Sequence, residues 1–165
     1  MTLTFQTLEE ARQYVLAHAK DGVSCPCCNR RVKEYQRNMN REMALFMLGL
    51  VALYYETGDW VHYKKCFLRA AGASSELHMR HDYGYVQFWG LAVKKANVDP
   101  TKNASGFWKP TELGVQFAQG QISVRSYIKH VNDDLTGWSE QLVTVQDALG
   151  TEFNYAEILK GNGSQ

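Results

Sequence analysis

Hydrophobic residues recur at helical spacing through most of the first half of this chain, and strand-like alternation becomes commoner in the second half. The strongest helical segment spans residues 40–56, "NREMALFMLGLVALYYE", and it is apolar on nearly every side. Asn40 is a suitable N-cap, and "TGD" at 57–59 ends the segment. A helix that is apolar all round belongs in the middle of a core, so we predict that position for it.

Three more helices are predicted before residue 90. The first spans residues 7–20, with Thr7 as N-cap and Glu10 completing a capping box. The others span residues 61–71 and a segment that Ser74 or Ser75 caps and that continues to about Trp89. On this last helix we expect Val86 and Trp89 to face the core.

A hairpin and a closing helix follow. "GLAVKKANV" and "FWKPT" read as two strands around a loop tip, and Thr111 caps the helix "ELGVQFAQG". Helices followed by a two-stranded hairpin and a closing helix are typical of a winged helix-turn-helix. The segment from "ISVRSYIKHV" to "VQDAL" predicts two further strands, and "NYAEIL" predicts a short helix.

The predicted fold class is therefore α+β, with a winged helix-turn-helix core. The predicted organisation is an N-terminal helix and CxxC turn with a basic connector at 1–38, the winged domain at 39–120, a small β-rich tail with a short helix at 121–160, and a disordered end at 161–165. A chain of 165 residues with 45% hydrophobic residues is long enough to bury a core without disulfides or metals.

Charge is distributed unevenly along the chain. The net formal charge is +1, but residues 29–110 carry a net +6 and residues 111–165 a net −4. A basic middle and an acidic end suggest that one face meets an anion, and an unevenly charged, solvated surface is the alternative.

The sequence favours a cytoplasmic location. The N-terminal segment lacks the basic and apolar regions of a signal peptide, and the longest apolar run, Met43–Tyr55, has 13 residues and is too short to cross a bilayer. The cysteines crowd together instead of spreading at intervals suited to disulfides, which is typical of a reducing compartment. We expect no membrane partner.

Three of the four cysteines lie in "SCPCC", and Cys25 and Cys28 have the C-x2-C spacing of half a zinc site. The best completion in this chain is His78 with His81, which gives one structural zinc. His18 and Cys66 are other candidate ligands. Two alternatives stay open: a metal-linked dimer that uses one pair of ligands from each chain, and a turn of free, partly buried thiols with unrelated surface histidines.

Several basic and polar residues are candidates for nucleic-acid contact. A basic run follows the cysteines, and its spacing over about three helical turns would line one face beside Tyr35. The helix before the hairpin would enter the major groove, and the hairpin would touch the DNA backbone. The candidates are Arg30, Arg31, Lys33, Arg37 and Arg41 in the run, Arg80, His81, Tyr85 and Gln87 on the helix, and Lys94, Lys95, Lys102, Asn103 and Lys109 on the hairpin.

Catalytic motifs are absent from the sequence. It has no glycine-rich phosphate loop, no G-x-S-x-G and no H-E-x-x-H. His62 and Cys66 are close in sequence and of the types that form a nucleophile pair, but helical packing explains Cys66 equally well. We therefore predict a protein that is not an enzyme.

Four segments resemble, in the same order, a family of small phage and prophage proteins of poorly defined function: "SCPCCNRRVKEYQRNMNREMA", "YVQFWGLAV", "GFWKPTELGVQFAQGQISVRSYIKHV" and "VQDALGTEFNYAEIL". The family's pattern is a CPxCG-like turn, an apolar helix, "LRYWGLI", "GxWRITEKGxxFVRG", a "VPKYV"-like strand and "DALGxxFDYxEL". The likeness extends from about residue 7 to residue 160. It implies a phage or mobile-element origin and the host bacterial cytoplasm, and it implies no activity.

This chain departs from the family's pattern in four places. Where the family has Gly, this chain has Asn29, and where the family has Leu-Arg-aromatic, it has Val86-Gln87-Phe88. Lys109-Pro110-Thr111 replaces the family's Arg-Ile-Thr, and "ISVRSYI" replaces its "VRVPKYV". The missing Arg weakens the expectation that the helix before the hairpin contacts DNA.

The sequence thus predicts a DNA-binding accessory or regulatory protein of a phage or mobile element, binding double-stranded DNA, in one reading as a homodimer. The alternative is a phage-encoded inhibitor of a host defence factor. Its partner would be a host nucleic-acid-binding protein, and the winged helix would serve only as a scaffold.

Overall fold

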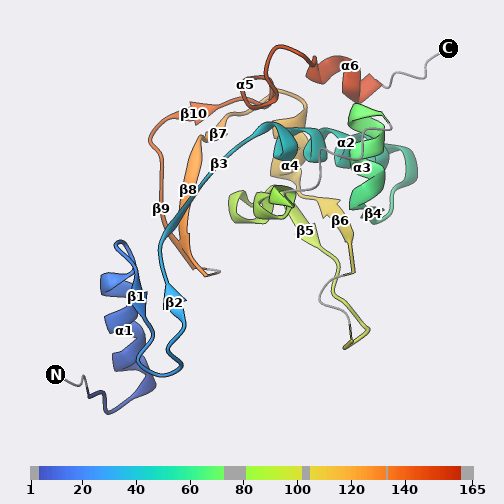
Figure 1. Ribbon diagram of the computed structural model, residues 1–165. Helices are drawn as coiled ribbons and strands as arrows, with labels where there is room; N and C mark the ends of the chain where they lie inside the picture. Colours follow the sequence, from blue (N-terminus) through green and yellow to red (C-terminus); the bar gives the residue numbers. More distant parts are fainter. Residues whose placement is uncertain (1–3, 73–80, 102–104, 133, 161–165) are drawn as a thin grey trace. The chain divides into compact units, whose positions relative to one another are not determined.

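The computed structural model describes residues 4–72, 81–101, 105–132 and 134–160, and the fold is a mixture of helices and strands, as the predicted α+β class requires (Figure 1). The chain forms two compact units. The first comprises Met1–Asn38 and Tyr127–Ser139, and the second comprises Met39–Ser126 and Glu140–Gln165. The expected tail at 121–160 therefore contributes residues to both units.

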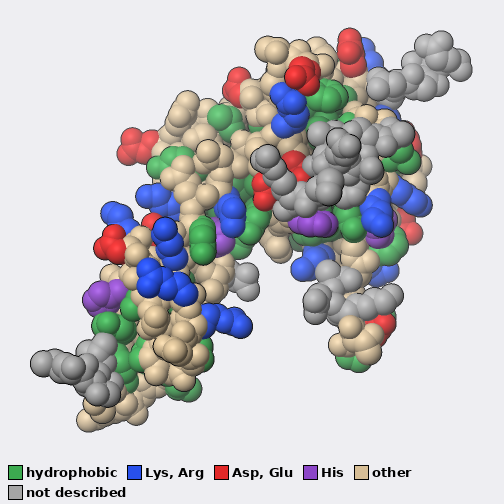
Figure 2. Space-filling view, in the orientation of Figure 1, with side chains coloured by type: hydrophobic (Ala, Val, Ile, Leu, Met, Phe, Trp, Pro, Cys, Tyr) green, Lys and Arg blue, Asp and Glu red, His purple; other side chains and the backbone are tan. Residues whose placement is uncertain are grey.

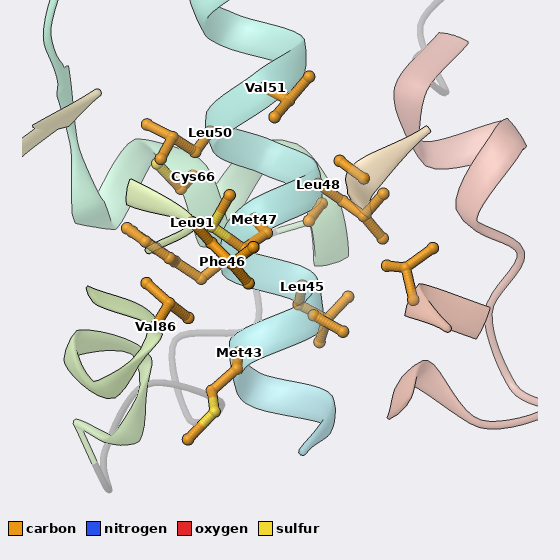
Figure 3. Packing of buried hydrophobic residues seen from close by; sticks show 14 of the residues in the cluster. Met43, Leu45, Phe46, Met47, Leu48, Leu50, Val51, Cys66, Val86 and Leu91 are labelled. Carbon is orange, nitrogen blue, oxygen red and sulfur yellow. The ribbon is translucent and has the colours of Figure 1, made fainter. Parts of the chain in front are cut away.

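The second unit is built around helix α2 (Arg41–Thr57). Asn40 caps this helix by accepting a hydrogen bond from the backbone N–H of Met43 at 3.0 Å, and Gly58 ends it with a left-handed φ of 69°. Eleven successive residues, Glu42–Ala52, are buried, so the helix lies inside the core as predicted. Figure 3 shows side chains of several elements around α2, among them Cys66, Val86 and Leu91.

Helix α3 (Tyr63–Ala71) packs so closely on α2 that no side chain fits at the crossing. A Cβ atom added to Gly49 of α2 would lie 1.9 Å from the backbone carbonyl oxygen of Cys66. Because that neighbour is backbone and not a flexible side chain, the two helices would have to separate to admit it.

Replacing Gly49 by Ala is therefore expected to lower the free energy of unfolding by about 3 kcal/mol or more, the upper part of the range for overpacked cores. Urea unfolding followed by circular dichroism measures the change. Gly84→Ala is the matched control, because a Cβ there meets nothing within 4 Å. Equal unfolding midpoints for Gly49→Ala and the unaltered chain would contradict the close crossing.

A three-stranded antiparallel sheet covers another side of α2. Its order is β4 (Val61–His62), β6 (Phe107–Pro110), β5 (Ala92–Lys94). Apart from Lys94 at the end of β5, which pairs with Trp108 but is exposed, the paired residues alternate as expected for a sheet with one covered face. Val61, Ala92, Trp108 and Pro110 are buried, whereas the opposite face carries His62, Phe107, Val93 and Lys109. The hairpin predicted from the sequence is thus confirmed, with β4 as an added strand.

The predicted helix up to Trp89 is wrong in kind over its described part. Residues Asp82–Trp89 form a 3-10 helix, η2, and residues 73–80 lie outside the described chain. His81 precedes η2 with a left-handed φ of 59°, which interrupts α-helical geometry, and Gly84 lies within it. Val86 is nevertheless fully buried and Trp89 packs against the core, as expected.

Helices α4 (Glu112–Ala118), α5 (Val145–Leu149) and α6 (Tyr155–Lys160) complete the second unit, with β7 (Val124–Arg125) paired to β10 (Leu142–Val143). Thr111 caps α4 as predicted. The segment "VQDAL" was expected at the end of a strand and is helical instead. Thr144 and Asp147 form a reciprocal capping box, which starts a helix at Val145.

The first unit combines α1 (Leu8–His18), the hairpin β1 (Val23–Ser24) and β2 (Arg31–Val32), and the sheet β3 (Tyr35–Asn38), β8 (Tyr127–Val131), β9 (Asp134–Trp138). Its small core consists of Val15, Ala19, Val32 and Val131. The predicted helical spacing of the basic run is wrong, because Arg31–Val32 and Tyr35–Asn38 are extended strands.

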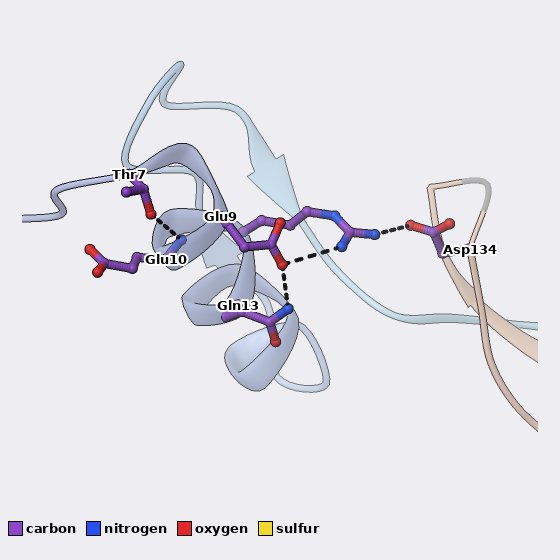
Figure 4. Close-up of polar contacts among 6 residues, drawn as sticks. Thr7, Glu9, Glu10, Gln13 and Asp134 are labelled. Carbon is purple, nitrogen blue, oxygen red and sulfur yellow. Dashed lines mark hydrogen bonds and ion pairs between the residues drawn. The ribbon is translucent and has the colours of Figure 1, made fainter.

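Polar contacts hold α1 in the first unit (Figure 4). Thr7 accepts the backbone N–H of Glu10 at 3.1 Å, which confirms the predicted cap. The carboxylate of Glu10 accepts the N–H of Gln6 and not that of Thr7, so the capping box is shifted by one residue. Arg12 lies 3.2 Å from Asp134 of β9 and 3.8 Å from Glu9. These pairs are exposed, so each stabilises the unit only slightly.

Within the described ranges, no helix combines the length and the apolar character needed to cross a membrane.

Candidate metal and nucleic-acid binding residues

Cys25, Cys27 and Cys28 lie in a tight turn, residues 25–29, between β1 and β2; we call it the cysteine turn. The backbone N–H of Cys25 donates to the carbonyl oxygen of Arg30 at 2.8 Å, and the N–H of Asn29 donates to the carbonyl oxygen of Cys25 at 2.8 Å. Asn29 has a left-handed φ of 62°, a conformation that Asn tolerates better than most residues. Backbone hydrogen bonds thus fix the turn without any bond between sulfurs.

The sulfur of Cys25 lies at the centre of this turn. The backbone N–H groups of Cys27 and Cys28 donate to it, and these donors lower the pKa of the Cys25 thiol. The neighbouring thiols of Cys28 and Cys27 lower the pKa of Cys25 further, by a smaller amount. Partial burial and the neighbouring Cys25 raise the pKa of Cys27. The pKa of Cys25 and the pKa of Cys27 are therefore shifted in opposite directions within one turn.

The structure does not test the four-ligand zinc site. His78 lies outside the described residues, and Cys25 and Cys28 belong to the first unit whereas His81 belongs to the second. The ring of His81 is exposed and its centroid lies 6.2 Å from that of Tyr83. Among the residues that the structure describes, no three His, Cys, Asp or Glu side chains are grouped so that they could hold a metal ion. Zinc bound by two cysteines and two histidines of one chain stays a prediction.

An apolar pocket of about 440 Å³ adjoins the cysteine turn within the first unit. Cys25, Cys27 and Cys28 line one wall. The other walls are mostly aliphatic and come from α1, β2 and β8, with polar groups at the rim: Leu8, Ala11, Val15, Leu16, Val32, Val131, Arg12, Arg30, Asn132 and Asp134. No sequence pattern indicates this pocket, because its walls come from segments more than 100 residues apart.

The basic candidates of the first unit follow the cysteine turn. Arg30, Arg31 and Lys33 are exposed, and Lys and Arg side chains gather over β2 and the start of β3 in Figure 2. Arg37 is half-buried, and its guanidinium lies 5.5 Å from the ring centroid of Tyr35. Arg41, the last of the run, belongs to the second unit, where it bonds the carbonyl oxygen of Leu149 and pairs with Glu152.

The hairpin β5–β6 carries the basic candidates of the second unit. Lys94 and Lys95 are exposed, with the ammonium of Lys95 5.8 Å from the ring centroid of Phe107. Lys109 is half-buried, and its ammonium lies 5.6 Å from the ring centroids of both Tyr54 and Trp60. Lys94 and Lys95 are therefore the more accessible cations of the hairpin, and Lys109 is the less accessible one.

On η2, Gln87 is exposed and Tyr85 is half-buried against Phe88, with ring centroids 6.0 Å apart. Arg80, Lys102 and Asn103 lie outside the described residues. The structure thus groups Lys94, Lys95 and Lys109 on one hairpin and Arg30, Arg31 and Lys33 on one segment of the other unit. That both groups of cations contact the same DNA stays a prediction.

Sequence reasoning missed a buried carboxylate that fixes η2. Glu42 is buried at the start of α2, and its Oε2 accepts the backbone N–H of Tyr83 at 2.8 Å. Asp82, the first residue of η2, accepts a hydrogen bond from the side-chain amide of Asn40, the N-cap of α2, at 3.1 Å. Two hydrogen bonds thus join the start of α2 to the start of η2. Burial, with a smaller contribution from the charge of Asp82, raises the pKa of Glu42. A Glu inside an otherwise apolar helix was the available signal.

The raised pKa of Glu42 makes stability depend on pH. The folded chain binds this proton more tightly than the unfolded chain, so stability falls as pH rises from about 4.5, the ordinary carboxyl value, through the raised pKa. Glu42→Gln keeps an acceptor for Tyr83 and removes the charge. We therefore expect the difference in unfolding free energy between Glu42→Gln and the unaltered chain to shift in favour of the variant as pH rises. Urea unfolding between pH 4 and 8 measures this, with exposed Glu140→Gln as control. Parallel curves for Glu42→Gln and the unaltered chain would contradict the assignment.

The structure explains Cys66 and His62 without chemistry between their side chains. The thiol of Cys66 donates to the backbone carbonyl of His62 at 3.5 Å, and Nδ1 of His62 accepts the N–H of Lys64 at the start of α3. Burial raises the pKa of the Cys66 thiol and, ahead of the charges of Lys64 and Lys65, lowers the pKa of His62. These contacts serve packing and capping.

Alkylation should separate the four thiols. In reduced, metal-free protein at pH 8, we expect iodoacetamide to modify Cys25, Cys27 and Cys28 and to leave Cys66 intact, because Cys66 is fully buried and hard to ionise. Peptide mass spectrometry measures the modification, and the same reaction in 6 M guanidinium gives the reference for four reactive thiols. Modification of Cys66 at the rate of the other three under native conditions would contradict its burial.

Comparison with protein-family models, with curated proteins and with solved structures gives no match. The resemblance to small phage and prophage proteins therefore stays a prediction.

Proposed function

We propose that this protein is a non-enzymatic, DNA-binding accessory or regulatory protein of a phage or other mobile element, acting in the host bacterial cytoplasm. The observation that carries the proposal is the strand order β4–β6–β5 of the second unit. In a winged helix domain, a short strand after the first helix pairs with the last strand of the wing hairpin. Strand β4 follows α2 and pairs with β6 in this way.

The winged-helix comparison extends to the order of elements. Helices α2 and α3 stand on either side of β4, η2 stands before β5, and the hairpin β5–β6 takes the place of the wing. Such a wing touches the DNA backbone, and Lys94 and Lys95 are exposed there. Gln87, exposed on η2, has an amide able to pair with adenine. The segment with Arg30 and Arg31 offers further phosphate contacts.

DNA binding of this kind must depend on salt, because each phosphate contact releases condensed counterions. We expect the full chain to bind random duplex DNA at ~50 mM salt, with log Kd rising linearly with log salt concentration. Lys94→Ala with Lys95→Ala should lower the slope by about two and weaken binding about tenfold or more at low salt. Fluorescence anisotropy of a labelled duplex over a salt series measures both quantities.

The matched control is Lys20→Ala with Lys160→Ala, which removes the same charge from exposed positions outside the proposed surface. If both double variants lose the same slope, overall charge and not the hairpin accounts for binding. If the unaltered chain does not bind at ~50 mM salt, the DNA proposal fails, since non-specific affinity is strongest there.

A specific observation favours a second candidate, a phage-encoded inhibitor that binds a host nucleic-acid-binding protein through the same face. The described part of η2 has no Lys or Arg, and Asp82 is its only formal charge. The nearby hairpin exposes Val93, Phe107 and Val98, with exposed fractions of 46%, 38% and 95%. Apolar groups among cations fit a protein partner better than DNA. Failure of DNA binding in the salt series would favour this candidate.

A further inference from the structure

The cysteine turn has the local structure of a metal-binding half-site. Its two hairpin strands are paired, and its backbone is closed by the hydrogen bonds from Cys25 to Arg30 and from Asn29 to Cys25. Cys25 and Cys28 lie at either end of the turn's C-x2-C segment, and both line the same pocket. Zinc binds cysteine as thiolate, and two cysteines three positions apart on a tight turn can bring two sulfurs to one ion.

Among its described residues, the first unit groups no third ligand with Cys25 and Cys28. Zinc in a structural site takes four ligands in a tetrahedron. Neither His18 nor His130 is grouped with the two cysteines. The Nδ1 atom of His18 is 2.8 Å from the carbonyl oxygen of Tyr14, and that of the buried His130 is 2.7 Å from the carbonyl oxygen of Asn132. Asp134, on the rim of the pocket, pairs with Arg12. No third ligand is grouped with the cysteines among the described residues.

A second copy of the chain completes such a site by symmetry. A twofold axis through the metal relates the pair Cys25 and Cys28 of one copy to the same pair of the other, and four sulfurs then surround one ion. We propose that two copies of this chain bind one zinc ion between their cysteine turns, so that the metal links them into a dimer. Each thiol releases its proton on binding, so four thiols of two copies lose up to four protons per zinc.

Two features of the surface around the turn suit this occupant. The pocket beside the sulfurs is walled by aliphatic side chains, and Leu8 on its edge is 78% exposed, so a second copy would cover apolar surface that one copy leaves in water. Four thiolates and Zn²⁺ together carry two negative charges. Arg30, Arg31 and Lys33 of each copy follow the turn directly and offset that charge.

The experiment uses the full chain, reduced, stripped with a chelator and reloaded with zinc. Zinc content by atomic emission and mass by light scattering after gel filtration are measured on the same sample. The proposal expects one zinc for every two chains, a dimer in the presence of zinc, and a monomer after renewed chelation. Reloading with Co²⁺ should give the intense thiolate charge-transfer absorption of four sulfur ligands.

Variants identify the ligands. Cys28→Ser should lose both the metal and the dimer. Cys27→Ser, in the same turn, is the matched control and should keep both, as should His81→Ala. Binding to DNA is not part of this measurement, so its outcome is separate from that of the salt series.

Three results would overturn the proposal. One zinc per chain in a monomer, lost in His81→Ala, would assign the metal to two cysteines and two histidines of one chain. A dimer that persists after chelation would show that zinc does not link the copies. Absence of zinc together with a mass 2 Da lower before reduction would show that the turn forms a disulfide instead. The ratio of zinc to protein and the mass of the unaltered chain distinguish one zinc per dimer from one zinc per monomer, even if Cys28→Ser does not fold.

Discussion

The second unit depends on the burial of residues 42–52 of α2 on every side of the helix. A helix without a polar face cannot lie on a surface, so other elements must cover it on every side, and α3, η2, the sheet β4–β6–β5 and the helices α4, α5 and α6 all contact it. The close crossing at Gly49 lets α3 approach α2 at backbone distance. Gly114 of α4 is similarly placed, since a Cβ there would lie 1.9 Å from the carbonyl oxygen of Leu91. Small residues at these two points decide how tightly the layers close.

The sequence predicted the elements whose signals are local. The caps at Asn40, Thr7 and Thr111 involve residues three positions apart, and all three are present. The apolar pattern of 40–56 was enough to place α2 in the core. The capping box at Thr144 is an equally local signal, but the partial alternation around it predicted a strand instead.

Features that join distant segments could not be predicted in the same way. Strand β3 pairs with β8, about 90 residues later, and nothing in either segment specifies the other. The 3-10 geometry of η2 follows from the left-handed His81 and from Glu42 and Asn40, which hold the start of η2 from another helix. In the candidate metal site, the spacing of Cys25 and Cys28 predicted two ligands. The hydrogen bonds that shape the turn became evident only in the structure.

The metal and nucleic-acid proposals place different demands on the same cations. Arg30 and Arg31 follow the cysteine turn, and a zinc ion with four thiolates would leave two negative charges beside them. Cations that offset those charges have less net charge to offer a phosphate. Lys94 and Lys95 belong to the other unit and do not offset the charge of the metal site. If both proposals hold, the hairpin should therefore contribute more to the salt dependence of DNA binding than the segment after the cysteines, and removing zinc should increase the share of that segment.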